Sequence, residues 1–551
     1  MAEATMGGGQ ARPSLFLRNA TGLVKAWSTF DAFVYSFWSV NLITLGLYGM
    51  SFVYTVPDGQ VLIAILLFGV LTTFLVVTYA MLVSVMPRTG GDYAWQSRVL
   101  GGGLGFVLSI TGWWFTLFLW APIYANILVV QFFSPLAYTL GWTNVASFFT
   151  SNNGIFVSCL LVLAFVSVVV TLGMETYARI QKICFWIGLG GLAVVILLLL
   201  FNDQSSFQAA FNRESAKLFG ASGDAYQATI DAATKGGFAG SSFGTVVFGS
   251  IGLLLPWLAF YLLWPNWGAT LYGEVRGAKD IRKPFWSMFW GLWVTVGLVA
   301  IVVLLIVKTV GWNFYQAANS LYWGSFFGGP APVIPQWPYP VMFAGWLVDN
   351  TAFQALLIIV MGLWFFGWAG TLFLSSTRVI FAAAFDRVLP SWAANISAKR
   401  RVPYGSLVLM IVPSLVISAI YAYKPSFTSV FLDATAVLAL TFFATVVAAI
   451  ILPWRRKDLY DASPIARYKL AGIPAISIVG VITGLFLLYM LWEWSFNASN
   501  LYGTSFSSTP NSVYYFIATY VVAVIIYVVA YYYRKSQGIS LSRIHHEIPV
   551  E

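Results

Sequence analysis

The sequence predicts an all-α integral membrane protein with about twelve transmembrane helices. Three observations support this fold class: an apolar composition, a series of apolar runs long enough to cross a bilayer, and an uneven distribution of lysine and arginine. Of the 551 residues, 59% are hydrophobic and only 9% are charged, and the mean hydropathy is +0.81. Because a soluble domain carries about 25% charged residues, this chain lacks the charge needed for a water-facing surface.

Twelve apolar runs have membrane length, since about 20 helical residues cross the ~30 Å hydrocarbon core of a bilayer. The expected spans are residues 31–55, 60–86, 104–134, 155–174, 179–201, 244–273, 285–311, 351–383, 404–422, 428–453, 470–494 and 512–533. Backbone groups inside a bilayer must pair within a helix or a closed barrel. The runs lack the alternating polarity of barrel strands, so helices are expected.

Lysine and arginine predict the orientation of these helices. If both termini are cytoplasmic, five of the 29 basic residues fall on the outer side, namely Arg213, Lys217, Lys235, Lys308 and Lys424. This is the bias of the positive-inside rule, so we expect a multi-pass protein of the cytoplasmic membrane. The net charge of +10 reflects the excess of basic residues on the cytoplasmic side. We therefore expect the lipid bilayer and a small molecule as partners, but no nucleic acid.

The chain is expected to form one transmembrane domain. Its predicted parts are a cytoplasmic N-terminal tail (1–30), a ten-helix core (31–453), a loop with two more helices (454–533) and a cytoplasmic C-terminal tail (534–551). The polar stretches 202–243 and 313–350 lie outside in this topology. Both are too short for an independent domain, although the second is rich in proline and aromatic residues and suits a short structured cap.

Two spans contain residues that interrupt helices. Residues 41–46 (Asn-Leu-Ile-Thr-Leu-Gly) lie in the first span, and residues 264–268 (Trp-Pro-Asn-Trp-Gly) lie in the sixth. Proline removes a helical hydrogen bond, and glycine lets the chain leave helical geometry at little cost in free energy. Either break can be an ordinary kink. However, the first and sixth of ten spans occupy equivalent places in two five-helix halves, where transporters bind their substrates.

Four segments carry a resemblance to a known family. They are 86–93 (Met-Pro-Arg-Thr-Gly-Gly-Asp-Tyr), 273–284 (Gly-Glu-Val-Arg-Gly-Ala-Lys-Asp-Ile-Arg-Lys-Pro), 375–390 (with Ser-Ser-Thr-Arg and Asp-Arg-Val-Leu-Pro) and 401–403 (Arg-Val-Pro). Their order, and their positions beside the spans, resemble those of the amino acid–polyamine–organocation transporters. The resemblance implies a five-plus-five inverted repeat of the LeuT type with discontinuous helices one and six, plus two extra C-terminal helices.

The resemblance also implies secondary active transport of amino acids or related amines by alternating access. In the family, the substrate carboxylate meets amides exposed by broken span one, and the amine meets carbonyl groups of spans one and six. Half-helix ends favour these charges. Carried over by register, the implied substrate contacts are Asn41, Thr44, Gly46, Phe260, Trp264, Pro265 and Asn266.

The chain departs from the family pattern at three places. The acidic gate position in span six is the neutral Asn266, and Gly188 stands where many proton-dependent members have a lysine in span five. The Gly-Ser-Gly of span one is not present as such, and residues 42–44 and 49–51 both remain candidates for its place. These departures weaken a lysine-based proton mechanism.

The sequence does not determine which ion, if any, is coupled to transport, and no other cofactor is expected. Oxygen ligands suit a sodium ion, and Thr371, Ser375 and Ser376 in span eight are the candidates. A proton would need an ionisable group, for which Asp433 and Glu274 are candidates, with Asp433 also the expected gate of the outer vestibule. Exchange or uniport without an ion is also compatible with the sequence.

Aromatic residues near the middle of spans three and eight can line a substrate pocket. Helical spacing places Trp114 with Phe118, and Trp364 with Trp368, on common faces. We expect substrate contacts at Trp114, Phe118 and Trp368. Because no counter-charge is visible nearby, these contacts favour a large or apolar substrate side chain.

Other function classes are less consistent with the sequence. A membrane-embedded enzyme that uses a histidine relay or a metal cluster would need a histidine inside the membrane. In this chain both histidines, His545 and His546, are in the C-terminal tail. A channel would need a selectivity filter or a ring of charges, and no such segment is evident. A sensor or scaffold that keeps the transporter fold without transport remains the alternative, and the sequence leaves the oligomeric state open.

Overall fold

The computed structural model describes residues 22–244, 246–424, 435–496 and 510–548. Within them, twelve helices are long and apolar enough to cross a membrane, which confirms the predicted fold class. The spans are Thr29–Met50, Val61–Val85, Gly102–Thr139, Asn152–Thr171, Met174–Phe201, Phe248–Glu274, Arg282–Ser325, Thr351–Phe385, Tyr404–Tyr423, Thr435–Arg455, Ala475–Phe496 and Pro510–Ser536. The inverted repeat and the division into core and tails stay predictions.

Five spans are composite. Span one contains α1 (Thr29–Val40), the π-helical segment η1 (Leu42–Gly46) and α2 (Leu47–Met50). Span three contains α5 (Gly102–Ile110), η3 (Thr111–Thr116), α6 (Leu117–Leu128), η4 (Val129–Phe133) and α7 (Ser134–Thr139). Spans six, seven and eight contain α13 (Phe248–Leu262) with η5 (Pro265–Glu274), α14 (Arg282–Leu305) with η6 (Ile306–Gly311) and α15 (Trp312–Ser325), and α17 (Thr351–Trp368) with α18 (Gly370–Phe385).

The other spans are single helices. They are α3 (Val61–Val85), α9 (Asn152–Thr171), α10 (Met174–Phe201), α19 (Tyr404–Tyr423), α21 (Thr435–Arg455), α23 (Ala475–Phe496) and α24 (Pro510–Ser536). Short elements connect them: η2 (Val53–Thr55), α4 (Asp92–Val99), α8 (Thr143–Thr150), α11 (Gln204–Phe219), α12 (Ala225–Lys235), α16 (Pro340–Trp346), η7 (Ser391–Ala394), α22 (Lys457–Asp461), η9 (Pro464–Arg467) and α25 (Leu541–His546). Strands β1 (Lys469–Leu470) and β2 (Ile473–Pro474) form a small antiparallel hairpin in which Lys469 pairs with Pro474.

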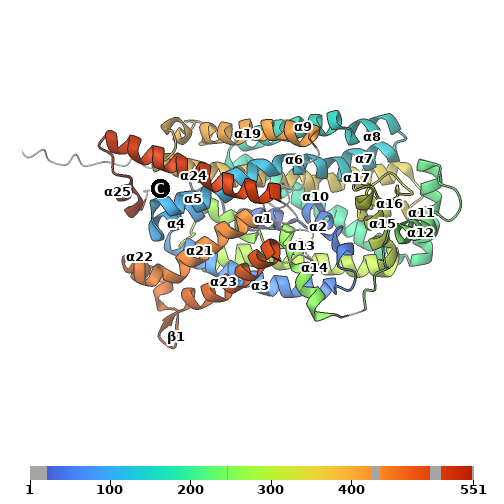
Figure 1. Cartoon of the computed structure of the whole chain (residues 1–551), viewed down its shortest axis with the longest axis horizontal. Coiled ribbons are helices and arrows are strands. Elements are labelled where there is room, and N and C mark those ends of the chain that lie inside the picture. Colours follow the sequence, from blue (N-terminus) through green and yellow to red (C-terminus); the bar gives the residue numbers. More distant parts are fainter. Residues whose placement is uncertain (1–21, 245, 425–434, 497–509, 549–551) are drawn as a thin grey trace, which may run out of the picture.

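The bundle has two different ends. Most long helices run along the horizontal axis of Figure 1, with α4, α22 and α25 at the left and α8, α11, α12 and α16 at the right. We call the left end the terminal end, since α25 lies close to the C-terminus, and the right end the cap. In the predicted topology the terminal end is cytoplasmic.

The cap corrects one predicted boundary. The sequence ended span seven at residue 311, but after η6 the helix resumes as α15 and continues to Ser325. Gly311, with φ of 88°, changes the chain direction between the two helical segments. Residues 313–325 are therefore helical and pack against α12 in the cap.

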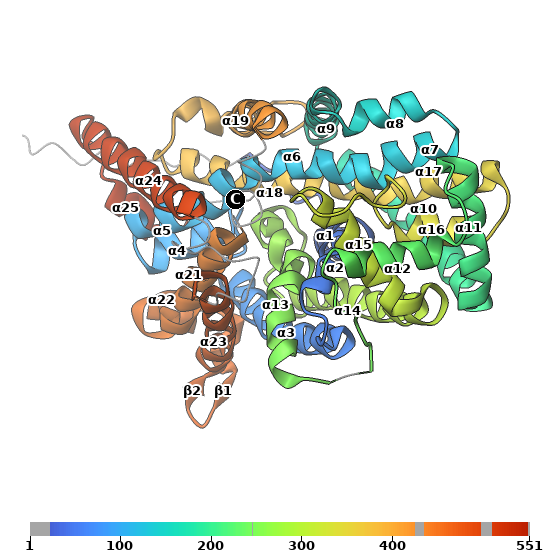
Figure 2. The ribbon, with the colours of Figure 1, turned by 45° about the vertical axis from the view of Figure 1, so that its right-hand side comes forward.

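Burial separates the central spans from the peripheral ones. In the most apolar stretch of span one, 89% of the residues are buried inside the protein, whereas in span twelve the share is 11%. Figure 2 shows α1 and α2 inside the bundle and α24 at its edge. Span one, which carries a predicted break, is therefore enclosed by other helices, and span twelve presents most of its surface outward.

Candidate substrate site

The break in span one lies at Asn41. This residue ends α1 with φ of 36° and ψ of 98°, outside helical geometry. Its side-chain oxygen accepts a hydrogen bond from the Thr44 amide at 2.9 Å, and its Nδ2 donates to the Trp364 carbonyl at 3.4 Å. Asparagine tolerates a positive φ better than most residues. Two places were candidates for this break. Residues 42–44 directly follow the irregular geometry at Asn41, whereas residues 49–51 do not.

The break in span six lies where the sequence placed it. Helix α13 ends at Leu262, and η5 begins at Pro265, which has no amide hydrogen to donate. The indole nitrogen of Trp264 donates to the Phe260 carbonyl at 2.7 Å, which satisfies one of the last carbonyl groups of α13. The polypeptide thus leaves α-helical geometry next to Trp264.

The two breaks contact each other. Ser36 Oγ in α1 donates to the Pro265 carbonyl at 2.9 Å. On the other side of the break, a Cβ atom added at Gly46 would lie 3.4 Å from the Tyr261 ring, and one at Gly49 would lie 3.3 Å from the Trp257 carbonyl. Glycine at 46 and 49 therefore allows span one to approach α13 closely.

Among the residues that the structure describes, several polar atoms beside the breaks have no hydrogen-bond partner. They are both amide atoms of Asn266, Thr44 Oγ1 and Trp267 Nε1, and each of these residues is at most 1% exposed. Buried polar atoms in proteins are almost always paired. The unpaired atoms therefore make this the candidate place for a polar ligand, and their burial closes them off from solvent in this conformation.

Aromatic rings surround this place. We call Trp113, Trp120, Trp264, Trp267 and Phe442 the aromatic cluster. The Trp264 ring lies 5.5 Å from Trp120, 5.8 Å from Trp267 and 5.9 Å from Phe442, and Trp113 lies 5.8 Å from Trp267. Phe260, the predicted lid, lies 6.3 Å from Trp120. The cluster gives the site an apolar wall.

Three predicted aromatic contacts lie outside the aromatic cluster, and their place at the site stays a prediction. Trp114 donates its indole hydrogen to the Leu409 carbonyl of α19 at 2.9 Å, and Phe118 is half-buried with its ring 6.1 Å from Phe115. Trp368 stacks on Tyr124 at 3.6 Å. In span three the residues that join the break are instead Trp113 and Trp120. The π-helical segment Thr111–Thr116 interrupts the α-helical period here, so the spacing of these two residues in the sequence did not indicate that both would reach the break.

Two of the three hydroxyl groups predicted for a coupling ion contact other protein groups in the described part of the chain. The Tyr35 hydroxyl contacts the Thr371 carbonyl at 2.7 Å and Ser375 Oγ at 2.5 Å. Thr371 Oγ1 donates to the Trp368 carbonyl of its own helix, while Ser376 Oγ is buried without a partner. Asp433, the predicted gate, lies outside the described residues.

The segments that carry the family resemblance meet at the terminal end. Arg378 of α18 and Glu274 of η5 form a buried ion pair, with Nε 2.8 Å from Oε1. Arg98 of α4 forms a second buried pair with Asp386. The Gly90 amide donates to the Thr270 carbonyl at 2.9 Å. The loop after span two is thus joined to span six, and span six is joined to span eight.

Comparison with known proteins agrees with this arrangement. A family profile described as amino acid permease matches residues 28–528. The chain belongs to the amino acid permease family. This permease is also similar to the branched-chain amino acid permease BcaP of Lactococcus lactis subsp. cremoris (strain MG1363), with 23% identity over 443 residues that cover 78% of this chain and 82% of the relative. The predicted family and amino acid transport are therefore confirmed.

One buried carboxylate of the permease had no role in the sequence-based prediction. Asp92 opens α4, between spans two and three, and is fully buried. It accepts hydrogen bonds from the Tyr79 hydroxyl at 2.5 Å, Thr445 Oγ1 at 2.6 Å and Trp113 Nε1 at 3.1 Å. Burial outweighs these donors and raises the pKa of Asp92 to about 6.

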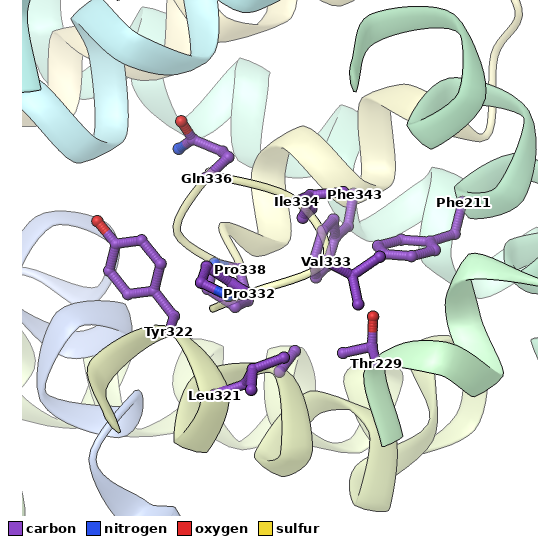
Figure 3. Close-up of a pocket in the computed structure, with 11 residues that line it drawn as sticks. Phe211, Thr229, Leu321, Tyr322, Pro332, Val333, Ile334, Gln336, Pro338 and Phe343 are labelled. Carbon is purple, nitrogen blue, oxygen red and sulfur yellow. The ribbon is translucent and has the colours of Figure 1, made fainter. Parts of the chain in front are cut away.

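A separate small pocket lies in the cap of the permease (Figure 3). Phe211, Thr229 and Leu321 line it from α11, α12 and α15, and the segment 332–338 covers it. Its lining comes from the cap alone and includes none of the residues at the two breaks.

Proposed function

We propose that this permease carries large apolar amino acids across the cytoplasmic membrane by alternating access, with the substrate bound between the breaks of spans one and six. The observation that supports this most directly is the unpaired Asn266 amide beside the aromatic cluster. An amide with a free donor and a free acceptor suits a zwitterion, and the cluster suits an apolar side chain.

The helix ends supply the charge complementarity for a zwitterionic substrate. The carboxyl ends of α1 and α13, at Val40 and Leu262, carry partial negative charge that favours an ammonium group. After the break of span one, the segment η1 begins with amides that favour a carboxylate, whereas η5 begins at Pro265 and offers no amide hydrogen at that position. These partial charges recognise the common part of an amino acid without a charged side chain.

The lining of the site favours an apolar substrate side chain. Trp120, Trp264 and Phe260 are at most 4% exposed, and Asn266 replaces the acidic residue of the family pattern. A charged side chain would lose its hydration here without gaining a counter-charge. The printed name of the Lactococcus relative, a branched-chain amino acid permease, supports the same substrate class.

Counterflow in proteoliposomes tests this proposal. Vesicles that contain the purified full-length permease are preloaded with unlabelled leucine, and uptake of labelled leucine, isoleucine and valine is compared with that of glycine, glutamate and lysine. We expect exchange of the branched-chain set, and thermal stabilisation of the detergent-solubilised protein by the same compounds. Uptake of labelled lysine or glutamate at the rate of labelled leucine or faster would contradict the assigned substrate class. No exchange and no stabilisation by any amino acid would contradict transport itself.

A further inference from the structure

Three spans converge on the carboxylate of Asp92. Tyr79 comes from span two, Trp113 from span three and Thr445 from span ten, and each donates one hydrogen bond to it. All three donors are neutral groups. Among the described residues, Asp92 forms no ion pair, so its charge is held only by hydrogen bonds.

The same loop touches the inner half of span six. The Gly90 amide binds the Thr270 carbonyl, and a Cβ atom added at Gly91 would lie 3.0 Å from the Ala269 carbonyl group. Asn266 lies beside the Tyr79 hydroxyl, although no hydrogen bond joins them in this conformation. A single side chain, that of Tyr79, therefore lies between Asp92 and the unpaired Asn266 amide of the candidate substrate site.

The other charged groups around α4 contact one another. On α4 itself, Arg98 pairs with Asp386, which follows α18. His545 of α25 lies 3.9 Å from the same carboxylate, and Tyr93 of α4 donates a hydrogen bond to it.

The remaining elements against α4 bring two more basic groups. Arg378 of α18 pairs with Glu274 of η5, and Arg456, which follows α21, pairs with Asp458. From span two the titratable group that faces Asp92 is Tyr79. Arg98, Arg378 and Arg456 thus each have a carboxylate of their own, whereas Arg88, in the loop before α4, donates to the Pro87 carbonyl at 3.3 Å.

We propose, resting on the transport function above, that Asp92 binds and releases one proton in each transport cycle and that this proton moves together with the amino acid. A carboxylate accepts its three hydrogen bonds from spans two, three and ten more strongly than the neutral acid does. Burial of the charge outweighs these bonds, so protonation stabilises the enclosed arrangement and loss of the proton favours the separation of these spans when the bundle changes conformation.

Tyr79 connects the proton to the substrate. When Asp92 is charged, the Tyr79 hydroxyl hydrogen points to Oδ1, and Asn266 Oδ1 lacks a donor. When a proton binds Asp92 Oδ1, the new O–H donates to the Tyr79 oxygen, and the tyrosine hydrogen turns toward Asn266 Oδ1. No bond other than the carboxyl O–H forms or breaks. The amide that contacts the substrate is thereby oriented by the protonation state of Asp92.

Two further observations favour a proton over a sodium ion at this site. The pKa of Asp92, raised by burial to about 6, makes both protonation states accessible near neutral pH. Of the three sodium candidates, Thr371 and Ser375 already contact Trp368 and Tyr35, which leaves Ser376 as the one hydroxyl among them without a partner in the described part of the chain.

Transport by Asp92→Asn in proteoliposomes tests the proposal. Vesicles at zero membrane potential are given an acidic exterior, and leucine accumulation and leucine exchange are measured separately. Wild type should accumulate leucine about tenfold for each pH unit of gradient, as one-to-one coupling requires. Asp92→Asn should still exchange leucine, at a rate independent of pH, but should not accumulate it. Asp231→Asn, on the exposed face of α12, is the matched control and should behave as wild type.

The outcomes separate this proposal from the transport function. Wild-type exchange without any response to the pH gradient would overturn the proton coupling alone, and so would accumulation by Asp92→Asn at the wild-type level. Absence of wild-type exchange would overturn the transport function itself. If Asp92→Asn does not fold, Tyr79→Phe provides the test, because loss of one donor to the carboxylate should move the pH midpoint of exchange upward by about one unit. An unchanged midpoint would overturn the proposal.

Discussion

Glu274 and Arg378 form a two-point ion pair in which both side chains are at most 1% exposed. The Arg378 Nε atom lies 2.8 Å from Oε1, and Nη2 lies 3.2 Å from Oε2. The pair joins the inner half of span six to span eight. It lies between the substrate site and the terminal end, so it helps to close that end in this conformation.

Arg378→Ala should lower the stability of the permease strongly. Removal of one partner leaves the Glu274 charge buried without compensation, which costs about 3–5 kcal/mol. The measurement is the apparent melting temperature in detergent. The control is Arg276→Ala, because Arg276 is exposed and donates to the Lys25 carbonyl, so its loss should have little effect. Equal melting temperatures for the two variants would mean that the ion pair does not stabilise this state.

Asn266→Ala should weaken leucine binding while leaving the fold intact. The amide has no hydrogen-bond partner within the described part of the chain, so its removal breaks no hydrogen bond seen there. One or two hydrogen bonds to the substrate correspond to about a tenfold loss of affinity. Leucine affinity is measured from the concentration dependence of thermal stabilisation. An affinity equal to that of wild type would remove Asn266 from the substrate site.

Trp120→Phe and Trp264→Phe should change substrate affinity, whereas Trp114→Phe should not. The first two rings belong to the aromatic cluster, but Trp114 is bonded to α19. Phenylalanine is the better replacement at 264, since alanine would leave a large cavity and cost about 3–5 kcal/mol. Competition of leucine, valine and phenylalanine for uptake measures the change. A larger effect at Trp114 than at Trp120 would contradict the assignment of rings to the site.

Asp92→Asn should change the pH dependence of stability. Burial raises the folded-state pKa of Asp92 from about 4 to about 6, so the folded state binds the proton more tightly than the unfolded chain does. The resulting stability is complete below about pH 4 and is lost as the pH rises through about 6, a total of about 3 kcal/mol. Asparagine does not titrate. The melting temperature of the variant relative to that of wild type should therefore rise from about pH 4 to about pH 8. A difference between the two proteins that does not change with pH would contradict this.

Gly91→Ala should reduce both folding yield and transport. Gly91 has φ of 42°, and an added Cβ atom would lie 3.0 Å from backbone atoms of Ala269 and Thr270. Neither backbone can yield easily, so the loop would separate from η5. The control is Gly190→Ala in α10, where a Cβ atom meets no atom within 4 Å. Yield by size-exclusion chromatography and leucine exchange measure both effects, and equal behaviour of the two variants would contradict the close contact.

The break of span one shows where local sequence becomes insufficient. Residues 42–44 and 49–51 both carried the small and polar residues that a broken helix needs. The irregular geometry lies at Asn41, because its amide reaches the Trp364 carbonyl of span eight while its oxygen caps Thr44. That choice depends on a partner 323 positions away in the chain. Residue type alone does not encode it.

Trp113 and Trp120 of span three show a second reason why the local sequence was insufficient to predict the residues at the site. A regular helix places Trp114 and Phe118 on one face, which is why they were expected at the site. Residues Thr111–Thr116 are π-helical, with a wider turn than an α-helix, so the faces downstream and upstream no longer follow one period. The rings that reach the break are consequently Trp113 and Trp120.

The sequence by itself determined the class, the twelve spans, the family and the position of the break in span six. These follow from local properties: an apolar run of about 20 residues must be helical in a bilayer, and a proline interrupts its helix. Only the tertiary structure decided that Asp92 is buried, because the glycines at 90 and 91 press its loop against span six. A polar loop residue thereby became a carboxylate enclosed by three spans, and this enclosure is what raises its pKa.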